Sequence, residues 1–125
     1  MTQEELSIFA RRYAEAWCSR DPGKVAAFYA KNATIRINNG PPAPIAEVVR
    51  EFAHDFPDML VTFDKLKDAP NGTEFHWTLT GTHRDSGNRV RISGYELWKI
   101  DNDGLVAESL GHFDAADYAR QLSTP

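Results

Sequence analysis

The chain is poor in cysteine: Cys18 is the only one in 125 residues. A lone cysteine cannot form an internal disulfide, and this composition is typical of proteins from reducing compartments. No histidine neighbours Cys18 in the sequence, so a catalytic thiol is not predicted and the residue is expected to pack as part of a helix.

Long hydrophobic runs and an excess of basic charge are also missing. No apolar stretch approaches the ~20 residues that a membrane-spanning helix needs, and Met1 to Ser7 lacks the basic and apolar regions of a signal peptide. The net charge is −4, whereas nucleic acid and anionic membranes are bound by clustered Lys and Arg. We therefore expect a cytoplasmic protein that binds neither nucleic acid nor membrane.

Histidine is sparse, and its spacing does not suit a metal site. His76 and His83 are seven residues apart along one predicted strand and so face opposite sides. His54 and Asp58 have helical spacing, but Pro57 stands between them and ends the helix. The sequence predicts no metal and no cofactor.

The residues that are present are typical of one globular domain covering residues 1–125. The first half is mainly helical. Apolar residues recur at helical spacing from Thr2 to Arg20 and from Ile45 to Phe56, and Asp21 with Pro22 opens a short helix between them. Residues 33–38 alternate as a short strand does.

The second half predicts strands at 59–68, 73–83, 89–100 and 105–113, followed by a last helical segment at 115–122. Asn71-Gly72 and similar turn signals separate these strands, which indicates antiparallel hairpins. Each helix has one apolar stripe to bury, so the helices must cover one face of the sheet. The expected fold class is α+β, with a strongly curved sheet that leaves a cavity beneath the helices.

Several segments, in this order and spacing, carry a resemblance that covers nearly the whole chain: Arg12 to Trp17 with Asp21, Val25 to Ile35, Trp77 to His83, Ser93 to Ile100, and Asn102 to Gly104 leading into Gly111 to Asp114. The chain resembles the nuclear transport factor 2-like superfamily, and most closely its branch of SnoaL-like polyketide cyclases and ketosteroid isomerases. The resemblance implies a cone-shaped, curved antiparallel sheet wrapped around three helices from the N-terminal half, which is a cystatin-like roll.

Strand alternation and the resemblance together predict a pocket of apolar and aromatic side chains suited to a flat hydrophobic ligand. The predicted ligand-binding residues are Trp17, Ile35, Ile37, Phe52, Phe56, Met59, Trp77, Leu79, Trp98, Ser109 and Phe113. The alternative for each aromatic residue is that it only fills space in a solid core.

Two polar residues, Tyr13 and Glu96, are the candidate catalytic groups. They align with the tyrosine and the protonated acid that form the oxyanion hole of ketosteroid isomerases. An inward Glu96 among aromatic walls should have a raised pKa. The alternatives are an outward Glu96 on a solvated face, or a Glu96 that bonds a structural partner such as an arginine or the Tyr13 hydroxyl.

The chain departs from the family at the usual catalytic aspartates. The isomerase base aligns with Ile37, and the acid–base aspartate of the cyclases aligns with Gly111, neither of which can move a proton. We therefore expect binding of a small hydrophobic, carbonyl-bearing molecule, with isomerase-, cyclase- or dehydratase-type chemistry as the enzymatic form. The alternatives are a non-catalytic binder of a hydrophobic ligand and a protein-interaction domain.

The outer face of the sheet mixes apolar and polar residues, as homodimer surfaces commonly do. This face is predicted to carry His76, Thr78, Thr80, Tyr95, Leu97, Leu110 and His112. Dimers are usual in the family that the chain resembles, so a homodimer through this face is expected.

Overall fold

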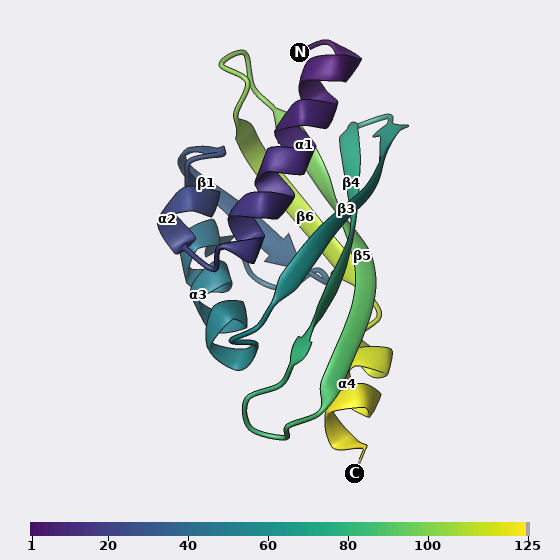
Figure 1. The fold of residues 1–125 in the computed structure, drawn as a ribbon. Helices are drawn as coiled ribbons and strands as arrows, with labels where there is room; N and C mark the ends of the chain where they lie inside the picture. Colours follow the sequence, from purple (N-terminus) through teal and green to yellow (C-terminus); the bar gives the residue numbers. More distant parts are fainter. Residues whose placement is uncertain (125) are drawn as a thin grey trace.

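The computed structural model describes residues 1–124. Within them the chain forms four helices and six strands (Figure 1). In chain order these are α1 Gln3–Cys18, α2 Pro22–Ala26, β1 Tyr29–Ile37, β2 Ala43–Pro44, α3 Ile45–Asp55, β3 Leu60–Ala69, β4 Gly72–Thr82, β5 Arg89–Ile100, β6 Val106–Phe113 and α4 Ala115–Ser123.

Helix α1 begins at a capping box. The Thr2 hydroxyl accepts a hydrogen bond from the Glu5 amide at 3.1 Å, and the Glu5 carboxylate accepts one from the Thr2 amide at 2.9 Å. The apolar stripe of the helix faces the sheet, and it buries Tyr13 and Trp17 one helical turn apart. The first helix therefore delivers two aromatic side chains to the interior.

The first strand begins earlier than the residues 33–38 predicted for it. Helix α2 starts at the expected Asp21 cap but ends at Ala26, and β1 already begins at Tyr29. The strand is interrupted near Asn32, which has a positive φ of 63°, and the register with β6 shifts between Tyr29 and Thr34. As a result the Tyr29 side chain is buried on the inner side.

The six strands form one sheet in the order β2-β1-β6-β5-β4-β3. The pairs from β3 to β6 are antiparallel, as the hairpin signals predict, whereas β1 runs parallel to β6. A parallel pair between strands so far apart in the sequence leaves no turn signal. This pairing sets Ile35 beside Ser109 and Ile37 beside Gly111.

Close packing of β4, β5 and β6 depends on Gly94. It pairs with Trp77 on one side and Phe113 on the other. A Cβ atom at this position would lie 2.2 Å from the His112 carbonyl oxygen and 2.8 Å from the Trp77 ring. The absence of a side chain at Gly94 therefore lets the Trp77 indole lie across the inner face of the sheet.

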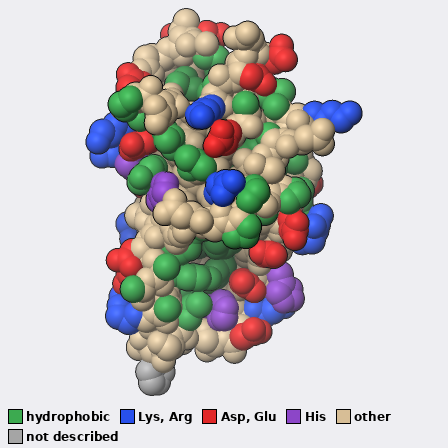
Figure 2. Space-filling model, turned by 180° about the vertical axis from the view of Figure 1, so that it is seen from behind, with side chains coloured by type: hydrophobic (Ala, Val, Ile, Leu, Met, Phe, Trp, Pro, Cys, Tyr) green, Lys and Arg blue, Asp and Glu red, His purple; other side chains and the backbone are tan. Residues whose placement is uncertain are grey.

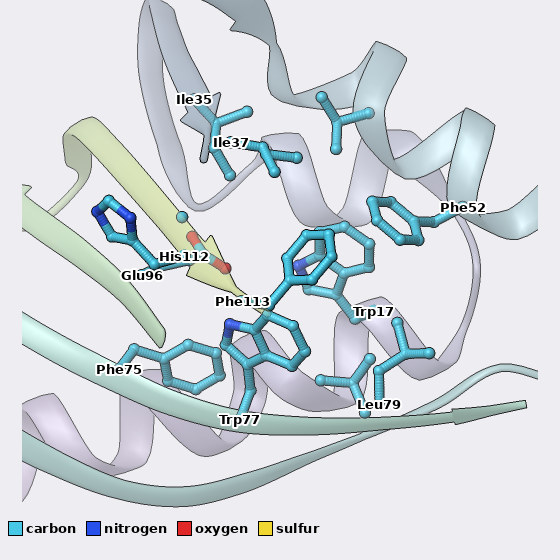
Figure 3. Close-up of a pocket in the computed structure, with 13 residues that line it drawn as sticks. Trp17, Ile35, Ile37, Phe52, Phe75, Trp77, Leu79, Glu96, His112 and Phe113 are labelled. Atoms are coloured by element: carbon cyan, nitrogen blue, oxygen red, sulfur yellow. The ribbon is translucent and has the colours of Figure 1, made fainter. Parts of the chain in front are cut away.

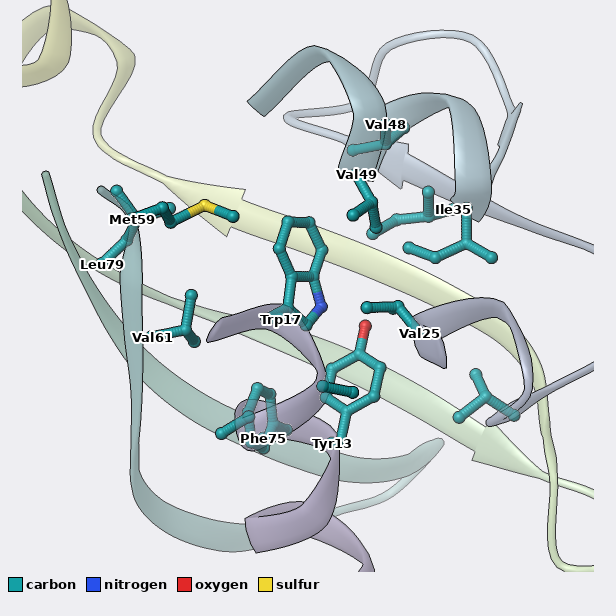
Figure 4. Close-up of a cluster of buried hydrophobic side chains, with 14 of the residues drawn as sticks. Tyr13, Trp17, Val25, Ile35, Val48, Val49, Met59, Val61, Phe75 and Leu79 are labelled. Atoms are coloured by element: carbon teal, nitrogen blue, oxygen red, sulfur yellow. The ribbon is translucent and has the colours of Figure 1, made fainter. Parts of the chain in front are cut away.

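The core lies between the inner face of the sheet and the helices, where Figure 4 shows Tyr13, Trp17 and Phe75 near Val25 and Val61. The architecture is a mixed α+β fold of the cystatin-like type. None of the helices in residues 1–124 is long and apolar enough to span a membrane.

Candidate functional site

An apolar cavity lies between the inner face of the sheet and helices α1 and α3 (Figure 3). Its volume is about 50 Å³, and it is partly open to the outside. A water molecule needs roughly 10–15 Å³ of such space, so the cavity is small and a ring-sized ligand requires side chains at its mouth to move. Figure 2 shows hydrophobic side chains gathered in a hollow in the lower half of the molecule.

Seven of the predicted ligand-binding residues line this cavity: Trp17, Ile35, Ile37, Phe52, Trp77, Leu79 and Phe113. Glu96 also lines it. The elements α1, β1, α3, β4, β5 and β6 thus bring together residues from the whole length of the chain. Contact between these residues and a ligand stays a prediction.

Four predicted residues lie outside the lining that residues 1–124 form: Phe56, Met59, Trp98 and Ser109. Phe56 and Met59 follow the end of α3 and are fully buried in the core. Trp98 points inward as expected, but the Phe75 ring stacks on it at 4.8 Å. Ser109 is fully buried and bonded to Glu96.

Five residues of the lining were not among the predicted ligand-binding residues: Val48, Val61, Phe75, Gly111 and His112. Strand alternation places Phe75 with Trp77, and Gly111 with Phe113, on the inner face of the sheet. Val48 precedes Phe52 by one helical turn, so these three positions had a usable sequence signal. The His112 ring lies 5.0 Å from the Tyr95 ring and pairs with it on the outer face.

Glu96 lies at the inner end of the cavity and is only 5% exposed. Four side chains donate hydrogen bonds to its carboxylate: Tyr29 at 2.9 Å, Trp98 at 3.0 Å and Ser109 at 2.7 Å to Oε1, and Tyr13 at 3.0 Å to both oxygens. Oε1 thus accepts hydrogen bonds from all four side chains, whereas Oε2 accepts one from the Tyr13 hydroxyl alone among residues 1–124. Oε2 therefore has the freer lone pairs.

Burial raises the pKa of Glu96 above its ordinary value of 4.5, although the hydrogen bonds from Trp98, Ser109 and the two tyrosines oppose that shift. Burial and the nearby Glu96 charge also raise the pKa values of Tyr13 and Tyr29 well above 10.0, so both phenols stay protonated donors. The site therefore holds one acid whose pKa is displaced toward neutrality.

The Tyr13 hydroxyl does not face the cavity. The side chain is fully buried, and its hydroxyl lies 3.0 Å from the Tyr29 hydroxyl as well as from Glu96. Tyr13 is also missing from the lining that residues 1–124 provide. Glu96 faces inward and bonds the Tyr13 hydroxyl, so Tyr13 supports the acid instead of offering a second donor to the cavity.

The indole N–H of Trp17 is buried beside the Tyr13 hydroxyl. The residue is 8% exposed, and Nε1 itself has essentially no exposed surface. Figure 4 shows this nitrogen on the side of the ring toward the Tyr13 hydroxyl, and a side-chain hydrogen bond with Trp17 opposes the rise in the pKa of Tyr13. The indole N–H is therefore directed at the Tyr13 hydroxyl.

The cavity wall is apolar where the resemblance places catalytic aspartates. Ile37 and Gly111 pair with each other in the parallel register of β1 and β6, and both line the cavity. Residues 1–124 also contain no group of three or more His, Cys, Asp or Glu arranged to hold a metal ion. Among the lining residues within 1–124, Glu96 is the one that carries a carboxyl group.

The outer face of the sheet carries a row of rings across β4, β5 and β6. The His76 and Tyr95 rings stack at 5.3 Å, and the His112 ring continues the row at 5.0 Å from Tyr95. These three residues are half-buried within the chain itself. A homodimer through this face stays a prediction.

The family model for the SnoaL-like domain matches residues 10–109. No protein of curated function matches the chain. The structure is similar to a putative hydroxylase, AclR, from Streptomyces galilaeus, with a TM-score of 0.82 and 15% identity over 99% of this chain and 89% of that one.

Two further solved structures show the same fold. TsrD from Streptomyces laurentii has a TM-score of 0.84 and 17% identity, covering 98% of both chains. A protein with a ketosteroid isomerase-like fold from Catenulispora acidiphila, solved in complex with trimethylamine, has a TM-score of 0.80 and 14% identity over 100% of this chain and 96% of that one. At these identities the likeness concerns the fold.

Proposed function

The chain belongs to the family of SnoaL-like domains, and from that premise we propose that its cavity binds a small, flat, apolar molecule bearing one carbonyl group. In this proposal the protonated Glu96 donates a hydrogen bond from Oε2 to the carbonyl oxygen. The apolar and aromatic walls bind the rest of the ligand, as is usual for small-molecule sites.

The observation that carries the proposal is a buried carboxyl group on the wall of an otherwise apolar cavity. A protein gains little stability from such a group, because burial of a charge is costly and well-packed apolar residues are often equal or better. Four donors nevertheless hold Glu96 in one orientation. A fixed acid in a water-poor cavity is well suited to stabilise charge that develops on a substrate oxygen.

The reaction that this site supports is enolisation of the bound carbonyl compound, as in an isomerisation, cyclisation or dehydration. A hydrogen bond from Glu96 to the carbonyl oxygen acidifies the neighbouring C–H group and stabilises the enol. The lining residues within 1–124 offer no separate carboxylate base. The α-proton therefore leaves to water or to a base on the substrate itself.

Ile37 and Gly111 favour a second candidate, which is binding of the same class of ligand without turnover. Both positions hold an aspartate in relatives of known chemistry, according to the resemblance stated above, and both are apolar here. Binding and turnover are separated by measuring them on the same compound.

A small tertiary amine is another candidate ligand. Aromatic walls such as those of Trp17 and Trp77 attract cations, and an ionised Glu96 would complement a positive charge. The structural neighbour from Catenulispora acidiphila was solved with trimethylamine. The two ligand classes require opposite protonation states of Glu96, so their affinities should change with pH in opposite directions.

The test uses acetophenone and α-methylstyrene, which replaces the carbonyl oxygen with a methylene group of similar shape. Calorimetric titration of the wild type and Glu96→Gln between pH 5 and pH 9 should show tighter binding of acetophenone at low pH in the wild type alone. Trimethylamine is titrated in parallel. Enolisation is followed by NMR as exchange of the acetophenone methyl protons in D₂O.

A pH-independent preference for acetophenone in the wild type would contradict the role of Glu96. Binding of trimethylamine that strengthens as pH rises, with no response to acetophenone, would favour the amine. Binding without proton exchange above the solvent rate would favour the non-catalytic candidate.

The row of His76, Tyr95 and His112 supports a homodimer through the outer face as a further part of the proposal. Replacing Tyr95 with Asp places a charge at the centre of that row. Sedimentation analysis should then show a dimer for the wild type and a monomer for the variant; a wild-type monomer would refute the dimer.

A further inference from the structure

We infer that Tyr118 of α4 sets the size of the ligand that the cavity admits, because its ring holds the Phe113 ring in place as a wall of the cavity. The inference rests on the proposed function, which makes the cavity the ligand site, and it gives a role to a helix outside that cavity. Phe113 contacts the ligand, and Tyr118 is a positioning residue that acts through Phe113.

The first argument is the way in which α4 begins. Asp114 caps the helix, and its carboxylate accepts a hydrogen bond from the Asp117 amide at 3.0 Å. In a hydrophobic staple, the residue before the cap packs against the fourth residue of the helix. Here these residues are Phe113 and Tyr118, whose rings meet edge to face with centroids 5.6 Å apart. The start of α4 therefore helps to fix the Phe113 side chain.

The second argument is that Phe113 is a wall held from several sides. It is the last residue of β6, and its amide donates a hydrogen bond to Asn38 Oδ1 at 3.0 Å, which fixes its backbone. Its ring lines the cavity beside the Trp77 ring, with centroids 6.2 Å apart (Figure 3). Tyr118 is not part of the lining that residues 1–124 form. It therefore contacts Phe113 from outside the cavity.

The third argument is that the cavity can enlarge more easily at Phe113 than at its inner walls. Trp17, Phe75 and Leu79 are less than 9% exposed and belong to the core between the sheet and the helices. Phe113 is half-buried, and no residue of α4 behind it is fully buried. Elements with few buried contacts open at lower cost than the core. The Phe113 wall is thus the movable one.

The strand register relates this wall to the ligand oxygen. Glu96 pairs with Gly111, and Phe113 lies two residues further along β6. Residues two apart on a strand share a face and are separated by roughly 7 Å. A ligand whose oxygen lies at Glu96 therefore reaches Phe113 after about one ring. With Tyr118 in place, the cavity should select carbonyl compounds with a single ring over those with two fused rings.

The far end of α4 is attached independently of Tyr118. The Gln121 side chain pairs with the Arg91 backbone. The Asn88 side-chain amide donates to the Gln121 and Leu122 carbonyl oxygens at 3.0 Å each. These links join the last turn of the helix to β5 and to the residue before it. Replacement of the half-buried Tyr118 should therefore change the wall without detaching the helix.

The experiment compares four ligands across three proteins at pH 5. Acetophenone and 2-acetonaphthone differ by one fused ring, and α-methylstyrene and 2-isopropenylnaphthalene are their hydrocarbon counterparts. Affinities are measured by calorimetry for the wild type, Tyr118→Ala and the matched control Tyr118→Phe, which keeps the ring. The ratio of two-ring to one-ring affinity tests the inference. The ratio of ketone to hydrocarbon affinity tests the proposed function separately.

In Tyr118→Ala the two-ring to one-ring ratio should rise about tenfold, since a second ring adds roughly 60 Å² of apolar surface that the enlarged cavity can bury. In Tyr118→Phe the ratio should stay within twofold of wild type. An unchanged ratio in Tyr118→Ala, or an equal rise in both variants, would overturn the inference. A wild type that does not prefer ketones overturns the proposed function, while the hydrocarbon pair still tests the size limit. Failure of all four ligands to bind any of the proteins overturns both.

A double-mutant cycle tests whether Tyr118 acts through Phe113. Phe113→Ala removes the wall directly and should raise the two-ring to one-ring ratio at least as much as Tyr118→Ala does. The double variant should then stay within twofold of Phe113→Ala, because two residues that act on one wall are not additive. Multiplication of the two single effects would contradict the inference, as would a wild-type ratio in Phe113→Ala.

Discussion

The hydroxyl oxygen of Tyr13 lies 3.0 Å from each carboxylate oxygen of Glu96. The contact joins α1 to β5 across 83 residues of sequence, and it decides how the cavity can act. A tyrosine that faced the cavity would be a second donor to a ligand. A tyrosine that donates to Glu96 instead fixes the acid and leaves Glu96 as the carboxyl group on the cavity lining.

Removing the carboxyl group should destabilise the fold strongly. In Glu96→Ala the four buried donors from Tyr13, Tyr29, Trp98 and Ser109 lose their acceptor, and each buried unpaired donor costs about 1–3 kcal/mol. We expect urea unfolding to show that the free energy of unfolding of Glu96→Ala is at least about 3 kcal/mol lower than that of the wild type. The control is Glu74→Ala, which removes a partly exposed carboxylate bonded to His76 and should cost less than about 1 kcal/mol. Equal losses in the two variants would mean that the Glu96 network is not structural.

The stability of the wild type relative to Glu96→Gln should depend on pH. Because burial raises the folded-state pKa of Glu96 above 4.5, the folded protein binds more protons than the unfolded chain between the two pKa values. The free energy of unfolding therefore falls as pH rises through this range, by up to about 1.4 kcal/mol per pH unit.

Urea unfolding of both proteins from pH 4 to pH 9 measures this effect. The difference in free energy, wild type minus Glu96→Gln, should be largest below pH 4.5, decrease as pH rises and become constant above the folded-state pKa. A difference that increases with pH would show that the four donors outweigh burial and lower the pKa.

Most helices and strands of the fold were predictable from local patterns, and the inward position of Glu96 was predicted from the family resemblance. The directions of several other side chains were not predictable. Turn signals such as Asn71-Gly72 and the capping box at Thr2 identify elements because they act within a few residues. The parallel pairing of β1 with β6 and the cover of Phe75 over Trp98 depend on contacts between distant segments. The same holds for the Tyr13 hydroxyl: spacing on α1 shows that the side chain is inward, but only the packed neighbours determine which acceptor it reaches.

Replacement by alanine should destabilise the protein at one glycine of the sheet, Gly94, and have little effect at another, Gly111. A Cβ at Gly94 would lie 2.2 Å from a backbone oxygen, whereas a Cβ at Gly111 meets nothing closer than 3.6 Å. In urea unfolding, the free energy of unfolding of Gly94→Ala should therefore be at least about 2 kcal/mol lower than that of the wild type. Gly111→Ala should stay within about 1 kcal/mol of wild type.

Gly111→Ala also tests the location of the binding site, because its new methyl group projects into the cavity beside Ile35 and Ile37. The folded variant should bind acetophenone several-fold more weakly than wild type. Unchanged affinity would place the ligand elsewhere.

The C-terminal helix α4 should loosen when its link to β5 is cut. The Gln121 side-chain amide pairs with the Arg91 backbone in both directions, at 2.8 and 2.9 Å. In Gln121→Ala, hydrogen exchange of the α4 amides should accelerate several-fold, while the core strands stay protected. Arg120→Ala removes only an exposed pair with Asp117 and should leave this exchange nearly unchanged. Equal acceleration in both variants would show that the link has no special role.

The most direct test of the central claim is the carbonyl ¹³C signal of labelled acetophenone bound to the wild type, recorded as a function of pH. A carbonyl that accepts a hydrogen bond from protonated Glu96 should resonate downfield of the free compound at low pH. That displacement should shrink as Glu96 ionises, whereas in Glu96→Gln it should be the same at every pH. A bound carbonyl signal that does not change with pH in the wild type would contradict the assignment of Glu96 as the group that binds the ligand oxygen.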